Sequence, residues 1–495
     1  MSAVPTPIPA SNADGNITQR VRARLSRLLS SGWVKSTLFK DTSNICLGQI
    51  IRLALQGVYF LCIARSLGPT QYGAFIAVTA LTSIIAPYVG LGSGIVFLKN
   101  VRTGKREADL CWGNGLVSIF VTGLLTTAAV CLLSHFFWCT IPLILIAAIG
   151  ISDLILNRII DLASLGFAAT GKMSKTAVQN TTMSLLRVIG ILFMIAFFRP
   201  VMMRQWIWVY LITAIIGAAY AFQQGTSLWG APRFSLAALW KDSREGTFFS
   251  ISISAQTIYN DIDKTMLAQL STFSATGVYA AAYRIIDASL TPVRSLLTAA
   301  YPEFFHVGTN GMRAAYSYAK HLIRKTVIFG LVDCVALVAL APLLPFILGH
   351  RYDSVTPALQ LLALIPIMRC VHCFLADALS GANEQAVRMV IQVCVALLNI
   401  GLNLLILPRW SWVGAAWTSL ISDLVLLISL YIAVQWKLPA GAVKGTIIRL
   451  THSDSISAPP NCSCAASGVT PPASRAHRVL NDDQSASPYP IGSAS

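Results

Sequence analysis

Apolar runs long enough to cross a bilayer as an α-helix, which takes about 20 residues, recur along most of the chain. Lipid leaves only helices and closed barrels as spanning structures, and runs of this length favour helices. Charged residues make up 12% of the chain, against roughly 25% in a typical soluble protein. The sequence therefore predicts an all-α polytopic membrane protein with about twelve transmembrane helices, near 43–64, 74–98, 114–134, 141–164, 177–198, 206–224, 246–270, 277–300, 326–349, 357–379, 390–408 and 413–435.

Lysine and arginine collect in alternate connections between these runs, including 99–106, 233–244 and 313–325. By the positive-inside rule this pattern predicts that both termini are cytoplasmic. The formal charge of +17 is then a topology signal, and we expect no nucleic-acid partner.

Five segments follow from this pattern. We expect a partly disordered cytoplasmic arm over 1–35, a six-helix bundle over 36–225 and a cytoplasmic connecting loop over 226–245. A second six-helix bundle occupies 246–436, and the Ser/Pro-rich stretch 437–495 is predicted to be a disordered cytoplasmic tail.

The two halves resemble each other faintly. The predicted span 74–98 follows Tyr72 and Gly73 and carries Pro87, and the span 277–300 opens with Gly277 and carries Pro292 at a similar depth. Six spans per half give both copies the same orientation, so the repeat is predicted to be parallel, with its axis along the membrane normal. The prolines are either a pair of hinges or static bends.

The stretch 277–305 carries five polar residues at steps of three and four: Arg284, Asp287, Thr291, Arg294 and Thr298. Helical geometry places them on one stripe. Because arginine at the centre of a lipid-facing helix costs roughly 2.5–3.5 kcal/mol, we expect this stripe to face protein or a water-filled cavity.

Other spans carry matching polar faces. The first has Asn44, Gly48, Arg52 and Gln56, and the seventh has Ser250, Ser254, Thr257, Asp261 and Lys264. Arginines over six spans outnumber the acids beside them, which predicts a wet, net positive central cavity with an anionic guest. The candidate substrate-binding residues are Arg52, Gln56, Arg158, Arg187, Arg284, Arg294, Arg369 and Asn399.

Each of these residues also has a plainer interpretation. Arg158 with Asp161, and Arg284 with Asp287, are spaced i, i+3 and could be local ion pairs that only fix packing. His372 could be a hydrogen-bonded packing group, and Asn399 could join helices. The cysteines lack metal-ligand spacing, so we expect no metal and no cofactor.

Several strings resemble Wzx-type polysaccharide flippases of the multidrug/oligosaccharidyl-lipid/polysaccharide exporter superfamily. They are ARSLGPTQYGAF (64–75), YNDIDKTMLAQL (259–270), GVYAAAYRI (277–285), AAYPEF (299–304) and VGAAWTS (413–419). The resemblance implies two six-helix bundles around a cavity that moves undecaprenyl-diphosphate-linked oligosaccharides across the bacterial inner membrane. It implies that arginines receive the diphosphate, with a polysaccharide polymerase and a chain-length regulator as further partners.

Three functions remain open at this point. A flippase for exopolysaccharide, capsule or O-antigen synthesis would use Asp153, Asp261 or Asp287 for ion coupling. A cation-coupled multidrug exporter should have an acid-rich cavity, which the arginines disfavour. A membrane glycosyltransferase or polymerase should have a large loop outside the membrane, and none is evident, so we expect no enzyme.

Overall fold

The computed structural model describes residues 37–137, 140–198 and 200–438. In this part of the chain the secondary structure is helical, which confirms the predicted fold class. The predicted arm 1–35 lies outside the described residues, as does all of the predicted tail beyond residue 438.

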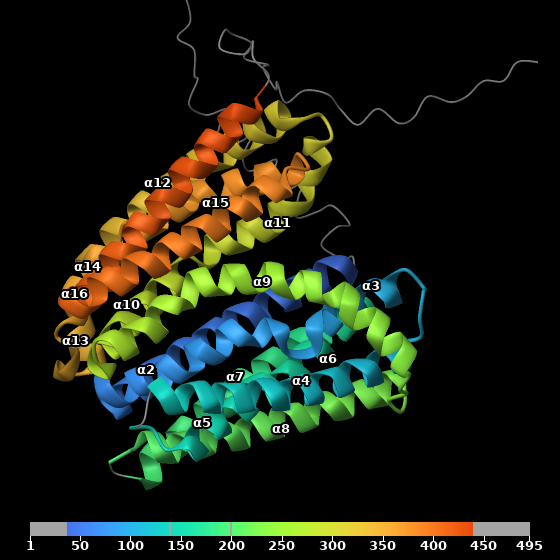
Figure 1. Cartoon of the computed structure of the whole chain (residues 1–495), viewed down its shortest axis with the longest axis horizontal. Coiled ribbons are helices and arrows are strands. Elements are labelled where there is room, and N and C mark those ends of the chain that lie inside the picture. Colours follow the sequence, from blue (N-terminus) through green and yellow to red (C-terminus); the bar gives the residue numbers. More distant parts are fainter. Residues whose placement is uncertain (1–36, 138–139, 199, 439–495) are drawn as a thin grey trace, which may run out of the picture. The chain divides into compact units, whose positions relative to one another are not determined.

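The first half of the chain forms one helical bundle (Figure 1). Its elements are α2 (Thr37–Ile85), the 3₁₀ segment η1 (Ala86–Gly92), α3 (Ser93–Arg102), α4 (Ala108–Phe137), α5 (Leu143–Gly150), the π-helix η2 (Ile151–Leu156), α6 (Asn157–Ala169), α7 (Met173–Phe197) and α8 (Met203–Trp229). Gly68 has φ 71°, which favours glycine, and Pro69 follows it. The long α2 is therefore two passes joined by a tight reversal.

The second half forms another bundle in the same way. Its elements are α9 (Leu236–Leu270), α10 (Phe273–Ser289), α11 (Thr291–Gly308), α12 (Met312–Leu340), η3 (Ala341–Leu343), α13 (Leu344–Leu348), η4 (His350–Tyr352), α14 (Val355–Leu362), α15 (Ile365–Gly381) and α16 (Gln385–Lys437). At Ser411, with φ 50°, α16 reverses direction as α2 does at Gly68.

Divided at Gly68 and Ser411, the described helices make twelve passes, each overlapping one predicted span. Eight of the described helices are long and apolar enough to cross a membrane by composition alone, and two of these are the double passes. The spans built from α9 and from α10 with α11 do not meet that test, because they carry the charged residues of the predicted polar stripes.

The predicted connecting loop 226–245 is shorter than expected. The helix α8 continues to Trp229 and α9 begins at Leu236, so only 230–235 is non-helical. The early turns of α9 lie on the first bundle, where Asp242 pairs with Arg106 and Glu245 pairs with Lys99. Farther along, Tyr259 donates a hydrogen bond to Asp423 of α16. One helix thus contacts both bundles.

The bundles meet where α2 crosses α10. A Cβ atom added to Gly73 would lie 1.8 Å from the Phe273 carbonyl oxygen, and one added to Gly277 would lie 2.0 Å from the Pro69 carbonyl oxygen. Only glycine permits such a close backbone approach. Corresponding positions of the two halves therefore contact each other reciprocally, as a parallel repeat requires.

Two helices carry apolar faces that do not pack inside the protein. Large apolar side chains on α4 and α12 are exposed, with Leu125 at 65% and Val335 at 70%. Asp333 of α12 accepts a hydrogen bond from Ser289 at the α10–α11 junction.

Candidate functional site

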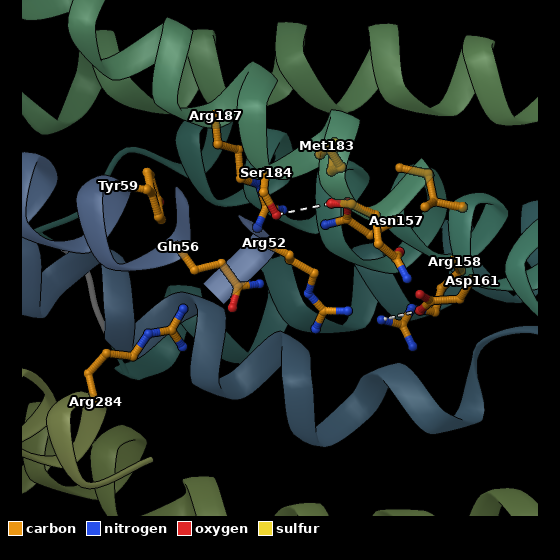
Figure 2. A pocket seen from close by; sticks show the side chains of 12 residues that line it. Arg52, Gln56, Tyr59, Asn157, Arg158, Asp161, Met183, Ser184, Arg187 and Arg284 are labelled. Carbon is orange, nitrogen blue, oxygen red and sulfur yellow. Dashed lines mark hydrogen bonds and ion pairs between the residues drawn. The ribbon is translucent and has the colours of Figure 1, made fainter. Parts of the chain in front are cut away.

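Four arginines from different helices line a cavity of about 340 Å³: Arg52 of α2, Arg158 of α6, Arg187 of α7 and Arg284 of α10 (Figure 2). Gln56, Asn157, Asn180 and Ser184 add amide and hydroxyl groups to its wall. Asp161 is the one carboxylate on this cavity among the described residues. The wall is therefore rich in cations and hydrogen-bond donors.

Two of the four arginines are held by neighbours. Arg158 forms an ion pair of 2.8 Å with Asp161, the local pair that the i, i+3 spacing offered as the plainer interpretation. Arg187 donates a hydrogen bond of 3.2 Å to the Tyr210 hydroxyl, and its guanidinium lies 4.8 Å from the ring centroid. These contacts fix both side chains at the cavity wall.

The other two arginines are unpaired. Among the described residues, Arg52 and Arg284 make no hydrogen bond and no ion pair. Figure 2 shows Arg52 extending from α2 and Arg284 from α10, with the Gln56 side chain drawn between their guanidinium groups. Cations inside a membrane protein require a counter-charge or water, and no described side chain supplies a counter-charge to this pair.

The alternative pairing of Arg284 with Asp287 does not occur. Asp287 instead accepts from Arg294 at 2.5 Å and lies 3.6 Å from Arg369 of α15. One turn of helix therefore separates a free arginine from a carboxylate that is already satisfied.

Two larger cavities adjoin the first. One of about 500 Å³ shares Arg158, Arg187 and Arg284 with it and reaches Asp153 and Asp261. The other, of about 950 Å³, lies between α2 and α10–α11. All five residues of the stripe predicted on 277–305 line this second cavity, with Arg52 and Gln56 also on its wall.

All three candidate ion-coupling acids accept hydrogen bonds or form ion pairs. Asp153 lies on the π-helix η2 and accepts hydrogen bonds from Thr82 at 2.8 Å and from Asn157 at 3.0 Å. Asp261 pairs with Lys264 at 2.5 Å. Within the described residues, no group of three or more His, Cys, Asp and Glu side chains is arranged to hold a metal ion.

Arg369 lies inside the second bundle. It is 8% exposed, donates to the Tyr283 hydroxyl, and its Nε lies 3.8 Å from Asp423. His372 Nε2 lies 3.3 Å from the same carboxylate. Sequence analysis did not single out Asp423, although an acid within the predicted span 413–435 is a functional signal by itself.

Asn399 does not line these cavities. It is 2% exposed, donates to Ser422 at 3.0 Å and accepts from Asn403 at 2.9 Å. The structure thus shows the helix-joining contact that was the plainer interpretation of this residue.

Sequence analysis also passed over two tyrosines that contact candidate arginines. Tyr210 contacts Arg187, and Tyr283 contacts Arg369. Tyr283 lies in the string GVYAAAYRI, one residue before Arg284. A tyrosine next to a charged residue inside a predicted span was therefore the signal that could have identified it.

A multi-pass membrane protein with two bundles of six passes around such a cavity has the fold of transporters of the MOP superfamily. The inward-facing conformation of a multidrug resistance MATE family transporter superposes with a TM-score of 0.65 at 13% identity, over 79% of this chain and 99% of that one. The outward-facing conformation of such a transporter gives 0.55 at 13% identity, over 80% and 95%. The lipid II flippase MurJ in an inward closed conformation gives 0.64 at 12% identity, over 79% and 87%.

The family is given by the sequence itself. The chain matches the polysaccharide biosynthesis protein family over residues 38–307, more than half of its length, and it belongs to that family. A search of curated proteins gives no match.

Proposed function

We propose that this protein flips undecaprenyl-diphosphate-linked oligosaccharide units across the bacterial inner membrane. The observation that carries the proposal is the pair of unpartnered arginines, Arg52 and Arg284, in a cavity between helices of both bundles. A diphosphate is the part of such a lipid that two guanidinium groups bind best, through charge-assisted hydrogen bonds.

The family and one structural neighbour support this substrate class. The family is one of polysaccharide biosynthesis, and a protein of the same fold is described as a lipid II flippase. Neighbours of the same fold are multidrug transporters, but a guest that is a cation would meet the unpaired arginines of this cavity. The exporter alternative is therefore the weaker one.

The contacts between the bundles suggest how the guest enters. At the end of the bundles that holds Gly68, Ser271 and Ser411, here called the hairpin end, two hydrogen bonds join the bundles. Tyr352 donates to the Ala64 carbonyl at 3.0 Å, and Arg65 donates to the Ile347 carbonyl at 3.0 Å. With both termini cytoplasmic, this end is periplasmic, and the cavity between α2 and α11 loads from the cytoplasmic leaflet.

The remaining candidates take supporting roles in this proposal. Gln56, Arg158 and Arg187 meet the polar parts of the guest, and Asp153, Asp261 or Asp287 exchanges an ion during transport. The product serves exopolysaccharide, capsule or O-antigen synthesis, beside a polymerase and a chain-length regulator. The protein itself catalyses no reaction.

Binding to the purified protein tests the proposal. The probes are undecaprenyl diphosphate and undecaprenol, which lacks the phosphates. Because a hydrogen bond to a charged group contributes roughly 1.5–3 kcal/mol, Arg52→Ala and Arg284→Ala should each weaken diphosphate binding roughly ten- to a hundredfold. Undecaprenol binding should stay within twofold.

Arg324→Ala is the matched control, since Arg324 is exposed on α12 and lies on none of the cavities. It should bind undecaprenyl diphosphate like the wild type. Equal binding of diphosphate by all three variants would refute the proposal.

A further inference from the structure

A fourth cavity, which we call the sugar chamber, lies inside the second bundle. It has a volume of about 550 Å³ and is lined by residues of α9, α11, α15 and α16, among them Asn260, Tyr301, Asp377 and Gln392. We propose that this chamber binds uncharged sugar residues of the transported lipid. The inference rests on the proposed function and assigns a second subsite to the same guest.

The sugar chamber continues from the arginine cavity. Arg294 and Thr298 line both the chamber and the 950 Å³ cavity between α2 and α11. Arg52, Gln56 and Arg284 in turn line both that cavity and the smaller one with the unpaired arginines. A guest held by its phosphates at Arg52 and Arg284 can therefore extend a polar chain into the chamber.

The charges on the chamber wall are balanced within the protein. Arg388 donates to Asp377 at 3.0 Å, and Arg294 donates to Asp287 at 2.5 Å. Arg369 lies between Asp287 and Asp423. No arginine of this wall resembles Arg52 in lacking a partner, so an acidic sugar would gain no free cation here.

The groups left without partners are neutral. The side-chain amides of Asn260 and Gln392 have no hydrogen-bond partner among the described residues, and both are half-buried on the chamber wall. An amide offers a donor and an acceptor together, which matches a sugar hydroxyl. Unpaired amides in a half-buried wall favour a guest that brings its own hydroxyl groups.

Apolar surface lies beside these amides. Leu297, Leu426 and Leu430 form part of the wall, and the Tyr301 side chain is 39% exposed. A pyranose ring has hydroxyls at its rim and C–H groups on its faces, so it can use both kinds of surface at once. Such a mixture, with a few placed polar groups, is typical of specific ligand sites.

Equilibrium binding to the full-length protein in detergent tests the assignment. The probes are undecaprenyl diphosphate carrying one N-acetylglucosamine, and the same lipid carrying a neutral tetrasaccharide of N-acetylglucosamine and glucose. The double variant with Asn260→Leu and Gln392→Leu should lose about tenfold in affinity for the tetrasaccharide lipid, because it removes the amides that would pair with sugar hydroxyls.

Its affinity for the single-sugar lipid should stay within twofold, because that glycan is too short to cross the intervening cavity, and this result also shows that the variant is folded. Gln385→Leu is the matched control, exposed on the same helix two turns before Gln392, and should affect neither probe. A milder variant, Gln392→Ala, should act in the same direction with a smaller loss.

Each other result has a definite meaning. If both lipids bind to the wild type and the double variant weakens both equally or neither, the chamber is not a sugar site, while the proposed function stands. If the wild type binds neither lipid, both the proposed function and the chamber assignment are overturned. If affinity depended on the length of the lipid chain and not on the length of the glycan, the chamber would be a site for the lipid tail, and the proposal would be refuted.

Discussion

The four arginines of the 340 Å³ cavity differ in whether their side chains have partners. Arg158 and Arg187 have partners within their own bundle, whereas Arg52 and Arg284 have none among the described residues. The paired arginines shape the wall, and the unpaired ones keep their full hydrogen-bonding capacity for a guest. Substitution of the second pair should therefore affect binding more than stability.

Asp423 provides the opposite case, a residue whose substitution should affect stability. It is 1% exposed on its side chain, accepts from Tyr259 and lies beside Arg369 and His372. Because Asp423→Asn removes one of the two carboxylates beside the buried Arg369, we expect a loss of roughly 3 kcal/mol in the free energy of unfolding. Thermal unfolding in detergent measures it.

Asp161→Asn is the control, because the Asp161 side chain is 50% exposed and an exposed ion pair contributes at most about 1 kcal/mol. If the two variants lowered the melting temperature equally, the buried cluster around Asp423 would not be a stabilising one.

Residue-level prediction succeeded where one helix decides the outcome. The Arg158–Asp161 pair followed from i, i+3 spacing, and it forms. The pair that the same spacing offered as an alternative at Arg284 does not form, because Asp287 meets Arg294 on the next helix and Arg369 across the bundle. The spacing of residues along one helix does not predict which charged residues of other helices lie beside them.

At the scale of elements, the matched prolines mark two unequal breaks. Pro87 lies in η1, where Gly90 has φ 73° and Leu91 has φ 45°, so the helix unwinds for several residues. Pro292 is the second residue of α11, and Leu290 before this helix has a φ of −75°, which stays near the helical range. The bends were predictable from proline, but their difference depends on the neighbouring glycines and on packing.

The crossing of α2 and α10 gives a prediction for a single glycine. Gly277→Ala places a methyl group against the Pro69 backbone, which cannot move aside as a side chain would. We expect the two helices to separate at the hairpin end and transport to fall at least about tenfold, since close helix packing there is lost. Transport in proteoliposomes and cysteine cross-linking of α2 to α10 measure the two effects.

Gly401→Ala is the matched control, because it lies within α16 and a Cβ atom there would meet nothing within 4 Å. If the Gly277→Ala variant kept wild-type cross-linking and transport, the close approach of α2 and α10 would not be required for transport.

The ends of helices were predictable where an apolar run that is long enough to cross the membrane gives way to polar residues. The start of α9 was missed because residues 241–245 are all polar or charged, which resembles a loop. They form a helix because Asp242 and Glu245 pair with Arg106 and Lys99 of the first bundle, a tertiary contact that no local pattern contains.

For the whole molecule, the two-bundle arrangement followed from the apolar runs and the faint repeat. The sequence could not predict the contacts between the bundles at the hairpin end, because these contacts join residues far apart in the chain. Tyr352 with Ala64 and Arg65 with Ile347 are examples, between residues more than 280 positions apart.

The central claim is that the unpaired arginines carry an anionic lipid across the membrane. The most direct test is the rate at which a fluorescent undecaprenyl-diphosphate-linked oligosaccharide becomes accessible to dithionite in proteoliposomes. We expect the double variant with Arg52→Ala and Arg284→Ala to slow this rate at least about tenfold, and Arg324→Ala to leave it unchanged. A wild-type rate in the double variant, at equal insertion, would contradict it.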